Sequence, residues 1–180
     1  WVDDDFGRRS PERAYCAARA LAAQYPTFYV LGNHEQWSGH ADEIKEALTA
    51  CGVTVLAGEW ADLDLDGAPI RLFGMDDPDV GEKLWQEQLA HLKEGLTEER
   101  VDLLLTHRPE RVEAYGGFDL VLAGHAHGGQ WRLPGLVNGL YAPNQGFFPK
   151  YAGGQYDLAG GGVMVVGRGL SRETTRVPRF

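Results

Sequence analysis

The stretch from residue 117 to residue 130 constrains the fold most strongly. Within it, Phe118–Ala123 is a short, mostly apolar run that carries Phe and Val, and such a run predicts a buried strand. Gly124 ends the strand, and His125 and His127 follow at once. Because alternate side chains of an extended segment point the same way, this pair directs two imidazoles toward one point. Imidazole is the commonest metal ligand in proteins, so we expect a metal site where this strand ends.

The rest of the chain alternates predicted helices with predicted strands. Residue periodicity, capping residues and turn residues predict helices over Glu12–Gln24, Ala41–Ala50, Glu82–Glu94 and Glu110–Tyr115. The same signals predict strands over Thr27–Leu31, Val53–Leu56, Val101–Leu105, Gln130–Leu133 and Val163–Val166, and a hairpin over Asp62–Met75 around Asp66-Gly67. Pro134–Gly162 is expected to be a long, irregular segment rich in glycine and aromatic residues. This alternation predicts an α/β fold with antiparallel hairpins toward the later part of the chain.

Two other predicted strands also end in residues that can bind metals. The strand Thr27–Leu31 runs into Asn33 and His34, and Val101–Leu105 runs into His107. Ligands of α/β sheets gather beyond the carboxyl ends of the strands, and four of the six histidines lie at such ends. Mixed oxygen and nitrogen ligands suit manganese, iron or zinc and argue against a calcium or magnesium cage. Since no cysteine is placed to complete a structural zinc site, we expect a catalytic site.

The composition limits the classes of partner. Asp and Glu outnumber Lys and Arg by 26 to 17, which gives a formal charge of −9 and no basic footprint for nucleic acid. A phosphorylated substrate remains compatible with this charge where bound cations invert its sign locally. The chain has no run of about 18 apolar residues, so no membrane span is predicted. Cys16 and Cys51 form no paired motif and indicate a reducing compartment, so we expect a cytoplasmic or membrane-peripheral protein; its oligomeric state is left open.

Three ordered motifs resemble those of the calcineurin-like metallophosphoesterase superfamily. They are Gly32-Asn33-His34-Glu35, Leu105-Thr106-His107 and Gly124-His125-Ala126-His127. The continuation from His127 to Pro134, and later Gly167-Arg168-Gly169-Leu170, is similar to the compact bacterial branch of that superfamily. The resemblance extends over nearly the whole chain.

The resemblance implies a fold, a chemistry and a set of roles. The implied fold is a layered β-sandwich flanked by helices (α/β/β/α), and the implied reaction is hydrolysis of phosphomonoesters, phosphodiesters or pyrophosphates by a metal-bound hydroxide at a two-metal site. It assigns Asn33, His107 and His125 to one ion and His127 to the other. His34 is then not a ligand but donates a proton to the leaving oxygen or stabilises charge on the phosphoryl group. The implied substrate is a phosphorylated small molecule or a lipid-linked phosphate.

The sequence departs from the family pattern at its start. The family's Asp-x-His and Gly-Asp motifs are missing, and Trp1-Val2-Asp3 fits only the last three positions of the second motif. We therefore expect one metallophosphoesterase domain over residues 1–180 that lacks its first βαβ-sized segment and is also cut short at its C-terminus. On this interpretation the fragment is weakly active or inactive, and restoring the segment raises its hydrolysis of phosphodiesters. The match also places Asp3 beside His34, which predicts a hydrogen bond that orients the catalytic imidazole.

Simpler readings stand beside this hypothesis. The chain is alternatively a catalytically silent metal-binding or interaction domain, or a single-zinc hydrolase in which His34 is a ligand. Asp76 and Asp77 precede a proline and are interpreted as a turn and the start of a helix. The aromatic residues between Pro134 and Gly162 either shape a substrate pocket, contact a lipid surface or pack on the edge of the sheet.

Overall fold

The computed structural model describes residues 12–131 and 136–169, which divide into two compact units. Unit 1 comprises the residues up to Trp60 together with Phe73–Glu94. Unit 2 comprises Ala61–Leu72 and the residues from Gly95 onward. Each unit holds part of the residues that the sequence singles out.

Unit 1 is mainly helical. Its helices are α1 (Glu12–Ala22), α2 (Asn33–Trp37), α3 (Ala41–Ala50), the 3-10 helix η1 (Pro78–Val80) and α4 (Glu82–Glu94). Its two short strands, β1 (Phe28–Tyr29) and β2 (Thr54–Val55), pair in parallel. The α1, α3 and β2 segments bury one shared apolar cluster, made of Ala18, Ile44, Leu48, Cys51 and Val53. Cys16 is exposed and Cys51 is buried, and both are free thiols.

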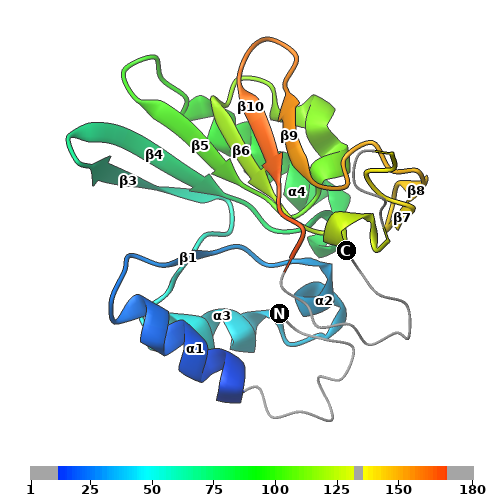
Figure 1. Cartoon of the computed structure of the whole chain (residues 1–180). Helices are drawn as coiled ribbons and strands as arrows, with labels where there is room; N and C mark the ends of the chain where they lie inside the picture. Colours follow the sequence, from blue (N-terminus) through cyan, green and yellow to red (C-terminus); the bar gives the residue numbers. More distant parts are fainter. Residues whose placement is uncertain (1–11, 132–135, 170–180) are drawn as a thin grey trace. The chain divides into compact units, whose positions relative to one another are not determined.

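Unit 2 is built on a mixed six-stranded sheet (Figure 1). Its strands lie in the order β3-β4-β5-β6-β10-β9, and the part of the β3-β4 hairpin from residue 61 to residue 72 belongs to this unit. The strands are β3 (Glu59–Leu65), β4 (Ala68–Gly74), β5 (Val101–Leu105), β6 (Leu120–Ala123), β9 (Gly154–Asp157) and β10 (Val163–Val166). β6 pairs in parallel with both β5 and β10, whereas β9 and β10 are antiparallel. The α/β class expected from the sequence is confirmed.

A row of apolar side chains across the three parallel strands forms the core of unit 2. Leu104, Val121 and Met164 share one register across β5, β6 and β10, and all three are fully buried. The 3-10 helix η2 (Pro109–Tyr115) contacts β10 and contributes the buried Tyr115. Packing of this row fixes the register of the strands that end in the candidate site, since a slip by one residue would turn these side chains to the opposite face.

Several details differ from the predictions. Gln130 and Trp131 form bends and not a strand, because Gln130 adopts a positive φ of 57°, which an extended strand does not allow; the rest of that predicted strand is outside the described residues. The segment Pro134–Gly162 is not wholly irregular, since it contains β7 (Tyr141–Ala142) and β8 (Gly146–Phe147), which form a small hairpin, and then β9. The predicted helix Glu110–Tyr115 is the 3-10 helix η2 with a kink at Arg111. In the described part of the chain, no helix is long and apolar enough to span a bilayer.

Candidate metal centre

The parallel strands of unit 2 bring the predicted histidines to one edge of the sheet. His107 follows the end of β5 by two residues, and His125 follows the end of β6 by the same spacing. Since β5 and β6 are parallel neighbours, their carboxyl ends lie at the same edge. His127 begins the 3-10 helix η3 (His127–Gly129) directly after this edge. The ends of β5 and β6 thus place His107 and His125 at one edge of the sheet.

Two of the imidazoles are in direct contact. Nε2 of His107 lies 3.2 Å from Nδ1 of His125, and the two rings are inclined by 68° with their centroids 4.9 Å apart. His125 is buried, at 5% exposure, and His107 is half-buried. The two nitrogens face each other, so a hydrogen bond between them requires a proton on one of them and a lone pair on the other.

The same separation fits joint ligation of one ion. Imidazole nitrogens bind zinc at about 2.1 Å, so two of them on one ion lie about 3.0 to 3.4 Å apart for ligand angles between octahedral and tetrahedral. The observed 3.2 Å between the His107 and His125 nitrogens is within this range. The donor set therefore fits a divalent transition metal. Among residues 12–131 and 136–169, however, no group of three or more His, Cys, Asp or Glu side chains is arranged to hold a metal ion.

The far side of the His125 ring is held by residues that the sequence did not single out. Its Nε2 lies 2.8 Å from Oδ1 of Asn144, in the turn between β7 and β8. The same oxygen accepts a 2.6 Å hydrogen bond from Nη1 of Arg108, whose side chain is buried and also contacts Glu110 Oε1 at 3.4 Å. Tyr115 donates a 2.6 Å hydrogen bond to the Arg108 carbonyl oxygen. Arg108 follows His107 directly, but nothing local in the sequence indicates the contact with Asn144.

The backbone after β6 is strained. His125, His127 and Gln130 have φ values of 61°, 48° and 57°, which side chains other than glycine adopt at a cost of about 1 to 2 kcal/mol each. Such outliers persist where the surrounding structure holds them, and they cluster at functional sites. Close packing at Gly129 is one of the contacts that keep this backbone in place, because a Cβ at Gly129 would lie 2.3 Å from the Cα of Gly139. The loop that carries the histidines is thus packed closely against the segment before β7.

Asn33 and His34 belong to unit 1, where they begin α2. Asn33 is buried and His34 is half-buried, with its ring 5.4 Å from that of Trp37. Glu35 Oε2 accepts a 2.8 Å hydrogen bond from the Gly32 backbone and so caps the helix. Burial, and then the Glu35 carboxylate, raise the pKa of Tyr29, so that hydroxyl stays protonated. Asp3, expected beside His34, is outside the described residues.

The paired carboxylates of unit 1 have structural partners. Asp77 Oδ1 accepts from the Asp79 backbone and caps η1, which confirms the turn and helix start predicted there. Asp76 is buried, and its Oδ2 contacts Lys45 Nζ at 3.3 Å and Gln88 Nε2 at 3.0 Å. Both aspartates therefore have structural partners within unit 1.

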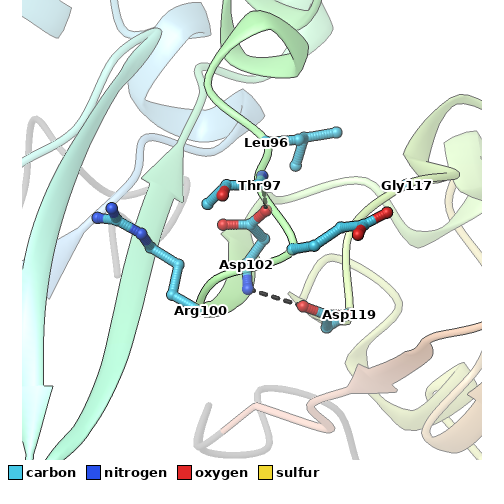
Figure 2. Close-up of a pocket in the computed structure, with 7 residues that line it drawn as sticks. Leu96, Thr97, Arg100, Asp102, Gly117 and Asp119 are labelled. Carbon is cyan, nitrogen blue, oxygen red and sulfur yellow. Dashed lines mark hydrogen bonds between the residues drawn. The ribbon is translucent and has the colours of Figure 1, made fainter.

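A pocket of about 440 Å³ lies at the other edge of the unit 2 sheet, where β5 and β6 begin (Figure 2). Its lining includes Thr97, Arg100, Asp102 and Asp119. Asp102 Oδ2 accepts from the Thr97 backbone at 2.7 Å, and Asp119 Oδ2 accepts from the Asp102 backbone at 2.9 Å (Figure 2). Burial, with help from the Asp119 charge, raises the pKa of Asp102. The pocket is therefore distinct from the histidine cluster, which follows the opposite ends of the same strands.

A comparison with models of known protein families shows which family the chain belongs to. The model of the family "Calcineurin-like phosphoesterase" matches residues 2–129, which include all three motifs. The chain belongs to this family. The resemblance inferred from the motifs is thereby confirmed.

Other members of the calcineurin-like phosphoesterase family align with most of the chain. It is 31% identical over 163 residues to the uncharacterised metallophosphoesterase YkuE of Bacillus subtilis, a match covering 89% of this chain and 54% of YkuE. It is 34% identical over 128 residues to the phosphodiesterase YaeI of Escherichia coli, covering 68% of this chain and 44% of YaeI. A metallophosphoesterase of Campylobacter jejuni is also 34% identical, covering 65% of this chain and 33% of that protein. The chain thus spans about a third to a half of these relatives.

A solved structure supports the fold. The NAD nucleotidase NadN of Haemophilus influenzae aligns with a TM-score of 0.50 at 16% identity, covering 89% of this chain and 34% of NadN. At this identity the likeness concerns the fold alone. It agrees with the α/β architecture described above.

Proposed function

We propose that the protein is a metal-dependent hydrolase of phosphoester bonds. The observation that carries the proposal is the His107–His125 pair, whose facing nitrogens lie 3.2 Å apart at the strand ends of a chain that belongs to the calcineurin-like phosphoesterase family. A phosphodiesterase, YaeI of Escherichia coli, is among the relatives, which favours phosphodiesters among the possible substrates. Phosphomonoesters and pyrophosphates belong to the same proposal.

The residues of this chain have separate tasks in the proposed reaction. His107 and His125 offer the facing nitrogens Nε2 and Nδ1 to one ion; the resemblance adds Asn33 to this ion and assigns His127 to a second one. Divalent manganese, iron or zinc ions, when bound, lower the pKa of water and supply positive charge for the phosphoryl oxygens. His34 holds a proton for the leaving oxygen, because alkoxide and phosphate leaving groups depart more readily when protonated.

The test uses the full-length protein that contains this sequence, stripped of metal and reloaded with Mn²⁺ or Zn²⁺. Hydrolysis of bis(p-nitrophenyl) phosphate, p-nitrophenyl phosphate and a dinucleotide pyrophosphate is measured, together with metal content by elemental analysis. We expect metal-dependent turnover of at least one ester class that is lost in His125→Ala and kept in His91→Ala, which replaces an exposed histidine of α4. Bound metal with no turnover of any substrate would instead identify a silent metal-binding domain.

A further inference from the structure

We propose that Asn144 is a positioning residue that fixes the proton of His125 on Nε2 and so keeps the lone pair of the ring on Nδ1, where a metal would bind. The proposal rests on the proposed function for the identity of the site, but it concerns a residue outside the family motifs. It follows from three atoms of unit 2: Nε2 of His125, Oδ1 of Asn144 and Nη1 of Arg108. Their contacts determine where each proton must be.

The orientation of the Asn144 amide follows from Arg108. A guanidinium nitrogen only donates hydrogen bonds, so the Asn144 atom that lies 2.6 Å from Arg108 Nη1 must be the acceptor, which is the carbonyl oxygen. An amide turned by 180° would place two donors against each other at this distance. Arg108 is 4% exposed. The Glu110 carboxylate contacts its side chain, and the Tyr115 hydroxyl donates a hydrogen bond to its carbonyl oxygen.

The tautomer of His125 follows from the amide. Its Nε2 lies 2.8 Å from the same oxygen, and an oxygen that cannot donate requires Nε2 to carry the proton. Arg108 Nη1 also lies 3.4 Å from His125 Nε2, which is farther than either atom lies from the Asn144 oxygen. A hydrogen bond at 3.4 Å would require Nε2 to accept. We therefore interpret Nη1 and Nε2 as two donors that share the Asn144 oxygen as their acceptor. A neutral His125 with its proton on Nε2 has its lone pair on Nδ1, which is the nitrogen that faces His107 at 3.2 Å.

The position of Asn144 suits this task. It lies in the turn of the β7–β8 hairpin with a φ of 60°, a conformation that asparagine tolerates better than most residues. Its side chain is exposed apart from the contacts of its oxygen, so replacing it removes the hydrogen bonds to His125 and Arg108 and little buried surface. The hairpin therefore contributes an outer partner to a metal ligand that is 19 residues away in the sequence.

The test compares Asn144→Gly with Asn144→Asp in the full-length protein. Glycine accepts the positive φ and removes the side chain, whereas aspartate retains an acceptor oxygen at the same place. The matched control is Asn138→Ala, which removes an amide of the segment before β7 that bonds to Gly153 and Tyr156. Two quantities are measured: the His125 tautomer, from two-bond ¹H–¹⁵N correlations of the metal-free protein labelled with ¹⁵N-histidine, and the Kd of Mn²⁺ by titration.

The expected results separate this proposal from the proposed function. Wild-type, Asn144→Asp and Asn138→Ala proteins show His125 protonated on Nε2, while Asn144→Gly shows a mixture of tautomers and binds Mn²⁺ about 10-fold more weakly, a loss typical of outer-shell partners. A wild-type protein with its proton on Nδ1, or an Asn144→Gly protein with unchanged tautomer and Kd, overturns the proposal. So does an Asn144→Asp protein that behaves like Asn144→Gly. Absence of hydrolysis alongside the expected tautomer change would contradict only the proposed function.

Discussion

Nε2 of His107 and Nδ1 of His125 lie 3.2 Å apart, although the two residues are separated by 18 positions in the sequence. Each follows a strand of the same parallel pair, so the sheet and not the loops sets the distance between them. The fully buried row Leu104, Val121 and Met164 fixes the register of these strands. A rigid scaffold of this kind is what a ligand pair needs in order to bind an ion without reorganising.

We predict that the substitutions His107→Ala and His125→Ala have non-additive effects. Each removes one of the two proposed ligands of a shared ion, so each lowers metal-dependent hydrolysis by more than the roughly 10- to 100-fold typical of an outer partner. Because the ion is already lost after the first substitution, the double variant is little worse than either single one. The measurement is kcat/KM with metal content for all four proteins. If the fold-loss of kcat/KM in the double variant equals the product of the losses in the two single variants, the two residues act independently.

We predict that His34→Ala lowers kcat by about 100-fold or more and leaves the metal content unchanged, as expected for loss of a general acid. His34 is half-buried at the start of α2, next to the ring of Trp37. The control is His40→Ala, which replaces a histidine whose side chain is 56% exposed. Elemental analysis accompanies the kinetics. A drop in bound metal in the His34 variant would instead support the single-zinc alternative, in which His34 is a ligand.

The features that the sequence predicted correctly depend on local signals. The apolar runs before His107 and His125 predicted two strands, and both strands are present. The Asp66-Gly67 pair predicted a hairpin turn, and both residues have the positive φ that a type I′ turn requires, at 54° and 88°. In each case the deciding interaction lies within a few residues of the signal, so a single sequence is sufficient.

The features that the sequence missed depend on distant partners. The β7–β8 hairpin is only two residues long in each strand, and the contact of Asn144 with His125 joins a turn to a strand end. The short helix α2 was also missed, because Asn33 is a weak helix former and begins a helix of only five residues. Its start is capped by Glu35, whose carboxylate accepts from the Gly32 backbone. Tertiary contacts determine whether such short elements form, and no periodic pattern in the sequence predicts them.

We predict that Tyr115→Phe lowers the free energy of unfolding by about 1 to 2 kcal/mol, because it leaves buried polar groups without their partner. The Tyr115 side chain is fully buried, and its hydroxyl donates to the Arg108 carbonyl at 2.6 Å and contacts Thr106 Oγ1 at 3.1 Å. The control is Tyr25→Phe, at a tyrosine that is 63% exposed. Urea unfolding of both variants checks the prediction. Equal stability of the two variants would contradict a structural role for the hydroxyl.

We predict that Asp102→Asn becomes progressively more stable relative to the wild type as the pH rises above about 4. Burial raises the pKa of Asp102 above its ordinary value of 3.8, with the Asp119 charge as a further cause, so the folded state binds this proton more tightly than the unfolded state. Stability from such a group is present at low pH and is lost as the pH rises from the unfolded pKa through the folded one. Asparagine cannot ionise, yet it can still accept the 2.7 Å hydrogen bond from the Thr97 backbone. The difference in unfolding free energy between the two proteins is therefore measured in urea from pH 4 to pH 8.

Asp62→Asn is the matched control, because the pKa of Asp62 is shifted in the opposite direction. Hydrogen bonds from Arg71 at 2.6 and 2.8 Å, and an ion pair with Arg100 at 2.9 Å, hold the pKa of this exposed carboxylate at about 2. Its contribution to stability is complete above the unfolded pKa of 3.8 and is lost only as the pH falls toward 2. The stability difference between Asp62→Asn and the wild type is therefore constant from pH 5 to pH 8, while that for Asp102→Asn increases from pH 4 upward. A flat profile for Asp102→Asn would show that its carboxyl ionises normally and that the start of β5 accommodates the charge.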